Sequence, residues 1–242
     1  MNSIIQLSVA LPVYNGAKNL KKHFNRIFKE CDRKKFKGFI EIIISDNCST
    51  DNTREITYFY KKKSLKKKNL CIKYYSNKKN LGYFGNFIRL PKLATGKYIL
   101  FFSDDDVPEK GFYSKIYSKI NNKNDNTMLI APIKNSKGYH KTFFGINKVS
   151  YIVNRGSPLS GVLLLTKKAK KYKTYLKTLY PHTELYLDYF LKFNSNDLKI
   201  RPIIVNVNKQ NLSEKLGDRM SRKQDLALLD KVKIIDKFYL KK

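Results

Sequence analysis

The chain has 242 residues, 42% of them hydrophobic, and its 50 Lys and Arg outnumber 19 Asp and Glu to give a formal net charge of +31. This length and apolar content predict a full hydrophobic core in one domain, with room for a small appendage. No stretch approaches the ~20 apolar residues of a membrane span, and the first residues lack the organisation of a secretory signal. We therefore expect a cytosolic protein.

The positive charge alone is weak evidence for nucleic-acid binding. Only eight of the basic residues are Arg, the side chain that binds phosphate and guanine through two hydrogen bonds. Residues 61–63 and 66–68 are Lys runs in an expected helix-to-strand loop, without interleaved aromatic residues for base stacking. We interpret them as a solvated loop, with attraction to an anionic membrane or an acidic ligand as the alternative. We expect no nucleic-acid partner.

The cysteines indicate a reducing compartment. Cys31, Cys48 and Cys71 are odd in number and show no CxxC spacing, which argues against a disulfide framework and against a structural zinc site. We expect all three to be small packing residues.

Strands and helices alternate over the first hundred residues. The apolar runs predict strands at residues 4–13, after Gly38, at 70–75 and at 97–102. The 3.6-residue spacing predicts helices at residues 17–30, 51–62 and 83–94, the last bent near Pro91. This alternation predicts an α/β fold with a mixed, mostly parallel sheet flanked by helices. On the first of these helices, we expect His23 at the surface.

The second half is less regular. A helix is expected through Phe112 and Ile120, followed by strands at 128–133, 161–166 and 200–207 and by helices at 167–179 and 183–193. The polar stretch 134–158 contains His140, Lys148 and Arg155, and we interpret it as a loop over a site with candidate metal or diphosphate contacts. Residues 212–242 are expected to form an amphipathic basic helical segment, which either packs on the protein or lies on a membrane surface.

Two acidic motifs follow apolar strands. Asp46 and Asp51 come after the strand that includes residues 42–44, and residues 103–106, Ser-Asp-Asp-Asp, come after the strand at 97–102. Ligands of open α/β sheets bind at the carboxyl ends of strands, and hard divalent cations prefer oxygen ligands. The motifs therefore predict a site for a metal ion and a nucleotide. For Asp51, a role at the start of a helix, with Ser49 or Thr50 as cap, is an equal alternative.

Four motifs in this order resemble the family 2 glycosyltransferases. They are Leu7–Asn15, Glu41–Thr53, Asn80-Leu81-Gly82 and Ala94–Asp106, and the resemblance covers about the first 110 residues. It implies the Rossmann-like GT-A fold, an inverting sugar transfer from a nucleotide-sugar donor, expected to be a UDP-sugar, and a divalent cation, Mn²⁺ or Mg²⁺.

The resemblance also implies roles for individual residues. The expected nucleotide-sugar-binding residues are Pro12, Val13, Tyr14, Asn15, Asp46, Asn80, Gly82, Asn86 and Asp104. Asp46 is expected to accept a hydrogen bond from the base, and Asp105 and Asp106 to bind the metal. Ser103 departs from the family pattern, which has Asp there as the ribose contact; Asp104 is the residue able to replace it.

An inverting transferase needs a general base for the acceptor hydroxyl. The family places this base as the Asp of a Glu-Asp pair, and here Glu184 matches the Glu while Leu185 occupies the position of the base. Glu184 is our first candidate and His182 the second, with Asp188 one turn beyond Glu184. A structural role is an even alternative for each, and a chain without a working base is a further one.

These inferences predict a GT-A domain at residues 1–211, with a nucleotide-sugar half at 1–110 and an acceptor half at 111–211, followed by the basic segment at 212–242. The expected acceptor is a glycan or a lipid-linked glycan of bacterial surface polysaccharide (capsule, lipopolysaccharide or lipooligosaccharide), with peripheral contact at the inner face of the cytoplasmic membrane. Oligomeric state stays open. The alternatives are a nucleotidyltransferase, for which residues 11–16 lack a Gly-rich triphosphate loop, and a non-catalytic basic nucleotide- or nucleic-acid-binding protein.

Overall fold

The computed structural model describes residues 5–34, 36–120, 129–130, 134–135, 138–139, 159–173, 176, 178, 180–192, 201–202, 207–209, 233–234 and 237. The larger sheet contains β1 (Leu7–Val13), β2 (Ile40–Asp46), β3 (Leu70–Ser76), β4 (Tyr98–Phe101), β6 (Leu129–Ile130), β9 (Val162–Leu165) and β10 (Arg201–Pro202). The smaller sheet contains β5 (Asp106–Pro108), β7 (Lys134–Asn135), β8 (Gly138–Tyr139) and β11 (Val207–Lys209). The helices are α1 (Ala17–Cys31), α2 (Thr53–Ser64), α3 (Gly82–Phe87), α4 (Leu90–Leu93), α5 (Phe112–Ile120), α7 (Thr166–Ala169) and α8 (Pro181–Lys192).

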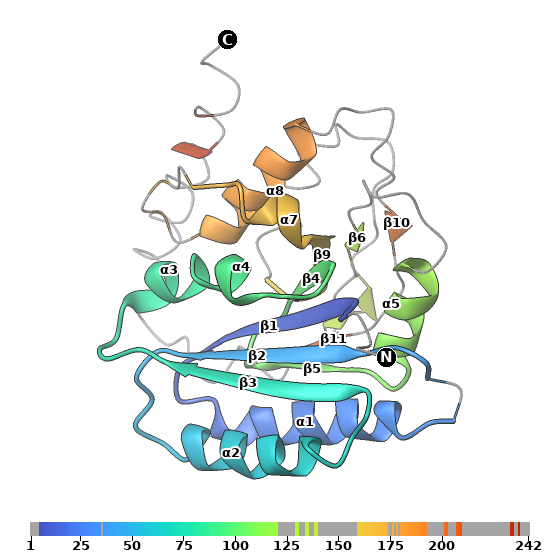
Figure 1. The fold of residues 1–242 in the computed structure, drawn as a ribbon. Coiled ribbons are helices and arrows are strands. Elements are labelled where there is room, and N and C mark those ends of the chain that lie inside the picture. Colours follow the sequence, from blue (N-terminus) through green and yellow to red (C-terminus); the bar gives the residue numbers. More distant parts are fainter. Residues whose placement is uncertain are drawn as a thin grey trace.

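The larger sheet has the strand order β10-β6-β9-β4-β1-β2-β3 (Figure 1). β1 pairs in parallel with both β2 and β4, and β2 with β3, whereas β9 runs antiparallel to β4 and to β6. Every residue of β1 and β2 is buried, because α1 and α2 cover one face of the sheet and α3 and α4 the other (Figure 1). The predicted mixed, mostly parallel sheet flanked by helices is confirmed.

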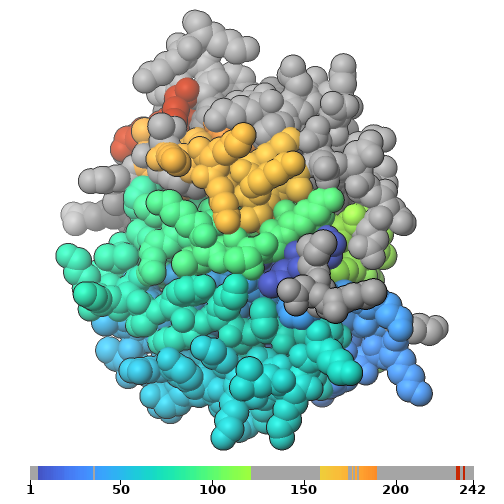
Figure 2. Space-filling model, viewed as in Figure 1, coloured from blue at the N-terminus to red at the C-terminus, as the bar shows by residue number. Residues whose placement is uncertain are grey.

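The second half packs onto this sheet. In the space-filling view, the gold and orange residues that include α7 and α8 lie against the green band that includes α3, α4 and β4 (Figure 2). α8 contacts α3, and α7 contacts β4. The strand predicted at 161–166 is present as β9, but the strand predicted at 200–207 is wrong as one element, since β10 belongs to the larger sheet and β11 to the smaller. Among the described residues, no helix is long and apolar enough to cross a membrane.

His23 is buried, so the expectation of a surface histidine was wrong. It is 1% exposed and shares a helical stripe with Leu20 and Ile27, the spacing that turns a side chain toward the core. Its Nε2 lies 2.5 Å from the Tyr113 hydroxyl, and its ring meets Phe102 edge-on at 4.8 Å. Burial lowers the pKa of His23 to about 3, while the backbone of Asp106 acts in the opposite direction. The imidazole is therefore neutral at physiological pH.

Two helix predictions need correction. The helix predicted at 83–94 divides into α3 and α4, because Pro91 has no N–H to continue a helix and stands at the start of the second one. The Lys run at 61–63 lies in the last turn of α2 and not in the following loop. Three cations there interact favourably with the helix dipole.

A buried carboxylate joins three strands inside the sheet. Glu41 of β2 is 0% exposed; it accepts hydrogen bonds from the Ser8 hydroxyl (2.5 Å) and from the backbone N–H of Thr95 (3.0 Å), and it pairs with Lys73 of β3 at 2.5 Å. We refer to Ser8, Glu41, Lys73 and Thr95 as the Glu41 cluster. Its partners compensate the cost of burying the charge.

Candidate functional site

The candidate site lies where the strand order reverses. The chain runs from β1 to β2 and β3 on one side and then returns to place β4 on the other side of β1. In open α/β sheets this switch point creates a crevice at the carboxyl ends of the strands. The loops after β1, β2 and β4 therefore converge there. Of the predicted site residues, Tyr14, Asn15, Asp104 and Asp105 lie on these loops, Asp106 follows them as the first residue of β5, and Pro12, Val13 and Asp46 end the strands before them.

The segment Ser103–Asp106 follows β4, and we call it the acidic turn. Asp105 is exposed, and its Oδ1 accepts a hydrogen bond from the Ser103 hydroxyl at 2.5 Å. Asp104 is half-buried, and its Oδ2 accepts one from the backbone N–H of Tyr14 at 3.2 Å. Asp106 is buried, with Oδ2 accepting from the Ser160 hydroxyl at 2.5 Å. The three consecutive carboxylates thus face three different environments.

The pKa of Asp104 is raised to about 6. Burial is the largest cause, the backbone N–H of Tyr14 opposes it, and the charges of Asp105 and Asp106 add to it. A carboxyl that is desolvated and set beside like charges holds its proton more tightly. A cation in this turn would reverse the effect, so the turn is electrostatically prepared to receive positive charge.

Gly16 permits the contact between the loop after β1 and the acidic turn. A Cβ atom at this position would lie 2.8 Å from Cγ1 of Val13 and 3.0 Å from Oδ2 of Asp104. The first distance is shorter than real Cβ contacts allow, so any side chain here would push the loop away from Asp104. The approach of the loop depends on the missing side chain.

The loops after β1 and β2 are joined by side-chain caps. Asn15 has φ of 54°, its N–H donates to the Ser49 hydroxyl at 2.9 Å, and its Oδ1 accepts from the backbone N–H of Thr50 at 2.8 Å. Asp51 accepts from the backbone N–H groups of Thr53, at the start of α2, and of Ala17, at the start of α1. Asp51 therefore accepts one backbone N–H at the start of each helix, as its expected structural role requires. Ser49 or Thr50 as the cap of α2 was wrong, since Asn52 holds the N-cap position.

Asp46 ends β2 with a heavily occupied carboxylate. It is 2% exposed; Oδ1 accepts from the backbone N–H and the hydroxyl of Ser49 (2.9 and 2.5 Å), and Oδ2 accepts from the Tyr74 hydroxyl. A carboxylate offers about four lone-pair positions. Contact between Asp46 and a base stays a prediction, and the structure leaves about one acceptor position for it.

Four asparagines beside Asp46 form a continuous amide network. Asn47 donates to Asn80 Oδ1 at 2.7 Å and accepts from Asn77 at 2.9 Å. Asn86 is 3% exposed, accepts from the Ser45 hydroxyl at 2.6 Å and donates to the Ser45 carbonyl at 2.8 Å. The network fixes the loops around Asp46, and its buried members position the backbone rather than offer donors to a ligand.

Two of its members, Asn47 and Asn77, were missed by the sequence analysis. Asn80 also accepts from the backbone N–H of Gly82, which has φ of +67° as a tight turn requires. The high density of Asn near the strand ends could have indicated this network. It was not distinctive, because Asn is abundant along the whole chain.

The three candidate bases lie on α8, but they face different surroundings. Glu184 is 0% exposed; it accepts from the backbone N–H of Leu176 at 2.8 Å and from the Thr178 hydroxyl at 3.0 Å, and it pairs with Lys237 at 3.2 Å. Burial raises its pKa, and these partners oppose the rise. Asp188 is half-buried four residues on. As a base, Glu184 stays a prediction, and its carboxylate is held inside the protein.

His182 is the candidate that the structure connects to the acidic turn. It is 3% exposed, and its Nδ1 lies 3.0 Å from the Tyr83 hydroxyl of α3. The side chain of Tyr83 is partly exposed, but its hydroxyl is desolvated. This desolvation, followed by the charges of Asp104 and Asp105, raises the pKa of Tyr83, so Tyr83 lies within the field of the acidic turn. The sequence analysis missed Tyr83, although it directly follows the Asn80-Leu81-Gly82 motif.

The acidic turn fits a hard divalent cation in its chemistry. Among the described residues, no group of three or more His, Cys, Asp or Glu side chains is arranged to hold a metal ion. Mg²⁺-type sites commonly combine one or two carboxylates with substrate phosphates and water. Asp105 offers such a carboxylate at the surface, with Asp104 beside it. Asp106 as a second ligand stays a prediction, and its carboxylate faces Ser160 in the interior.

Comparison with known proteins gives a consistent group of relatives. The family model for Glycosyl transferase family 2 matches residues 8–182. Over 104 residues the chain is 36% identical to abequosyltransferase RfbV of Salmonella typhimurium strain LT2, a match that covers 43% of this chain and 29% of that protein. The matched part is thus a minor fraction of the relative's length.

Two solved structures share the fold. TarS 1–349 from S. aureus, in complex with UDP-GlcNAc, superposes with a TM-score of 0.64 at 20% identity, over 85% of this chain and 59% of that chain. The mannosyltransferase PcManGT from Pyrobaculum calidifontis, in complex with GDP-Man and Mn²⁺, superposes with a TM-score of 0.65 at 12% identity, over 98% and 64% of the two chains. At these identities the likeness establishes the architecture.

Proposed function

Because the chain belongs to glycosyltransferase family 2, whose model spans most of it, we propose that it moves a sugar, with inversion, from a nucleotide-diphosphate sugar to a glycan or lipid-linked glycan. Its fold is of the GT-A type, as the structural relatives show. The donor, the acceptor and the stereochemistry are parts of the proposal.

One observation supports the proposal above the others. The backbone N–H of Tyr14 donates to Asp104 across the two neighbouring strands at the switch point, which places the loop after β1 against the acidic turn while Asp105 stays exposed. A nucleoside diphosphate needs both a pocket for the nucleoside and a counter-charge for the phosphates. This junction offers a loop of backbone and aromatic groups on one side and carboxylates for a cation on the other.

We assign the nucleoside to the loops after β1 and β2. Tyr14 is 49% exposed, so its ring is available to a planar base. Asp46 has about one acceptor position left for a ring N–H, as expected for uracil or guanine. UDP-GlcNAc and GDP-Man are the ligands of the two structural relatives, and a UDP-sugar remains our first expectation for this chain.

We assign Mn²⁺ or Mg²⁺ to Asp105, with Asp104 as its neighbour. When bound, such a cation neutralises the charge that develops on the departing diphosphate. Asp104 holds the loop after β1 through the Tyr14 N–H and adds negative charge to the turn. Asp106 accepts a hydrogen bond from Ser160, which lies just before β9. Asp106 therefore links the acidic turn to the segment that leads into this strand.

For the general base we place His182 before Glu184. The Nδ1 of His182 is hydrogen-bonded to Tyr83, which lies in the field of Asp104 and Asp105. Glu184 points to another side of α8, where its hydrogen-bond partners are Leu176, Thr178 and Lys237. A base must be within reach of the acceptor hydroxyl near the donor. Asp188, four residues beyond Glu184 on α8, is our third candidate.

The curated relative supports our proposal for the biological setting. RfbV is an abequosyltransferase, and its matched segment is similar to this chain over 104 residues. We propose the assembly of a bacterial surface polysaccharide as the pathway, with capsule, lipopolysaccharide and lipooligosaccharide as the candidate products.

Calorimetric titration tests the donor site directly. UDP, GDP, CDP and dTDP are titrated into the protein with and without Mn²⁺, in wild type and in Asp105→Asn. We expect one diphosphate to bind in a Mn²⁺-dependent manner, and the variant to lose at least about tenfold in affinity, because the substitution removes a charged metal ligand.

Asp32→Asn is the matched control. Asp32 is an exposed carboxylate beyond the end of α1 and pairs with Lys67, away from the acidic turn. Equal losses of diphosphate affinity in both variants would show that the loss reflects the change in net charge and not the removal of a metal ligand. If no diphosphate binds, the proposed transferase activity is rejected in favour of a basic binding protein.

A further inference from the structure

The exposed large apolar side chains of the described residues fall into two groups. One group surrounds the proposed donor site and consists of Tyr14, Leu81 and Tyr83. The other lies on α2 or directly after it and consists of Tyr58, Phe59 and Leu65, which are 46%, 54% and 81% exposed. The donor site explains the first group. The second calls for a separate explanation, since exposed apolar groups gathered in one place mark interaction surfaces.

These side chains lie on one face of α2. Phe59, Lys62 and Lys66 follow the i, i+3, i+7 spacing of a helix surface, and the backbone continues turning past Ser64, with Leu65 N–H donating to the Lys62 carbonyl. The opposite side of the helix is buried through Thr57 and its neighbours. We name as the α2 outer face the residues Tyr58, Phe59, Lys62, Lys63, Leu65 and Lys66.

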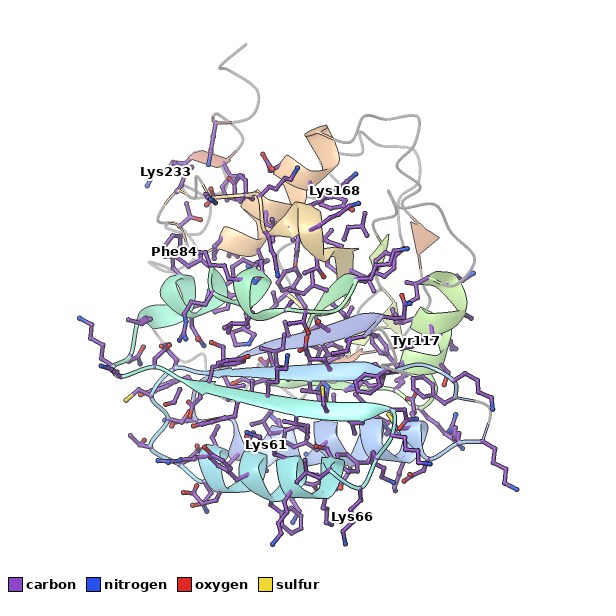
Figure 3. All side chains as sticks on the ribbon, in the orientation of Figure 1. Lys61, Lys66, Phe84, Tyr117, Lys168 and Lys233 are labelled. Atoms are coloured by element: carbon purple, nitrogen blue, oxygen red, sulfur yellow. The ribbon has the colours of Figure 1, made fainter. Side chains whose placement is uncertain are left out.

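Cations lie over the aromatic rings of this face, one from the face itself and one from its edge. Lys63 Nζ lies 4.3 Å from the centre of the Phe59 ring, and Lys61 Nζ lies 5.6 Å from that of Tyr58. Figure 3 places Lys61 on α2 and Lys66 at the outer edge below it. The aromatic residues stand directly before the Lys run in sequence, so the interpretation of a merely solvated loop missed them.

The charge of the face is strongly positive. Glu55 is the acidic residue exposed on α2, and the nearby Asp32 is paired with Lys67 of the loop after α2. Lys62, Lys63 and Lys66 are exposed. Glu55 lies on the same face, four residues before Phe59, but the lysines outnumber it. An apolar centre with surplus lysines around it is complementary to a surface that is apolar inside and anionic outside.

We propose that the α2 outer face docks the protein on an anionic membrane surface. Phe59 and Leu65 enter the boundary between headgroups and acyl chains, and the lysines extend along the rings to the phosphates. Single-stranded nucleic acid fits less well, because base stacking needs open ring faces and Lys63 already covers that of Phe59. The proposal concerns a surface outside the donor site and does not depend on sugar transfer.

Flotation of the full chain with vesicles tests this surface. We expect binding to phosphatidylcholine vesicles that contain phosphatidylglycerol, loss of binding on vesicles of phosphatidylcholine alone, and weakening by salt. Lys62→Glu with Lys66→Glu should lower the partition coefficient at least about 25-fold, since each lysine near an anionic surface contributes about fivefold. Phe59→Ser with Leu65→Ser should lower it about tenfold through lost apolar burial.

Lys115→Glu with Lys119→Glu is the matched control, because this pair is exposed at the same i, i+4 spacing on α5. The proposal requires that the control bind vesicles more than fivefold better than the α2 lysine variant. Equal losses, an absence of vesicle binding by wild type, or α2 variants that lose binding to single-stranded DNA but keep binding to vesicles would each overturn it. Circular dichroism of every variant confirms that it is folded.

Discussion

The Glu41 cluster and the acidic turn place carboxylates in the same sheet under opposite conditions. Glu41 is wholly buried, and although burial raises its pKa, bonds from Lys73, Ser8 and Thr95 outweigh this and lower it. Asp104 is less buried, yet burial and its like-charged neighbours raise its pKa to about 6. Hydrogen-bond donors therefore outweigh the effect of burial on the pKa of Glu41, whereas the single donor to Asp104 does not.

The difference separates a structural carboxylate from the carboxylates that we propose as ligand-binding. Glu41 needs no ligand to stabilise its charge, because two strands and a loop already supply its hydrogen-bond donors. The acidic turn has an exposed Asp105 and a deficit of positive charge. Glu184 accepts hydrogen bonds from Leu176, Thr178 and Lys237. In the number of its donors, Glu184 resembles Glu41 more than it resembles Asp104.

The strongest test of the comparison measures stability. Glu41→Ala should lower the free energy of unfolding by about 3 to 5 kcal/mol, because it leaves Lys73 and buried donors without their partner. Asp105→Ala should change it by no more than about 0.5 kcal/mol, as for an exposed residue. Urea unfolding of both variants measures the difference, and similar losses in the two would remove the distinction drawn above.

A second test compares the two candidate bases. His182→Gln should reduce kcat about 100-fold or more if the imidazole takes the proton of the acceptor, while the free energy of unfolding changes less. Glu184→Gln should instead lower stability by about 1 to 3 kcal/mol and leave most of kcat. A kcat loss confined to Glu184→Gln would restore Glu184 as the first candidate.

The third test varies the pH, and we expect its effect to be the smallest of the three. Mn²⁺-dependent affinity for the diphosphate should fall about tenfold per pH unit below about pH 6, because the proton on Asp104 then competes with the cation. For stability the sign is reversed: the raised pKa favours the folded state at low pH, and that contribution is lost as pH rises through about 6. Asp104→Asn removes both effects.

The nucleotide titrates in the same pH range, so the variant also serves as the reference. Calorimetry of Asp104→Asn reports the titration of the diphosphate alone. The assignment is rejected if wild type and variant show the same slope of affinity against pH.

The first half of the fold was predictable because its signals are local. Strands such as β1 and β2, buried on both faces, appear as continuous apolar runs, and α1 has a clear amphipathic stripe. The acidic turn was found for the same reason, since three Asp follow a strand. His23 was misplaced because a histidine on a basic helix looks polar until its stripe is compared with Leu20 and Ile27.

Long-range contacts were not predictable from the sequence. The antiparallel insertion of β9 and the division of β10 and β11 between two sheets depend on pairing partners far along the chain. The hydrogen bonds of Tyr83 with His182 and of Tyr74 with Asp46 also join elements that are far apart in the sequence. Local pattern identifies which residues are polar, but the fold decides which of them already have partners.

The position of β9 also sets an order for biosynthesis. β4 emerges from the ribosome long before Val162–Leu165, which are buried between β4 and β6 in the finished sheet. The nascent chain can pair β1, β2, β3 and β4 in parallel, but β4 then presents a bare edge able to recruit other nascent chains. Slow translation between β4 and β9 would prolong this exposure, so the yield of folded protein should be sensitive to codon choice in that interval.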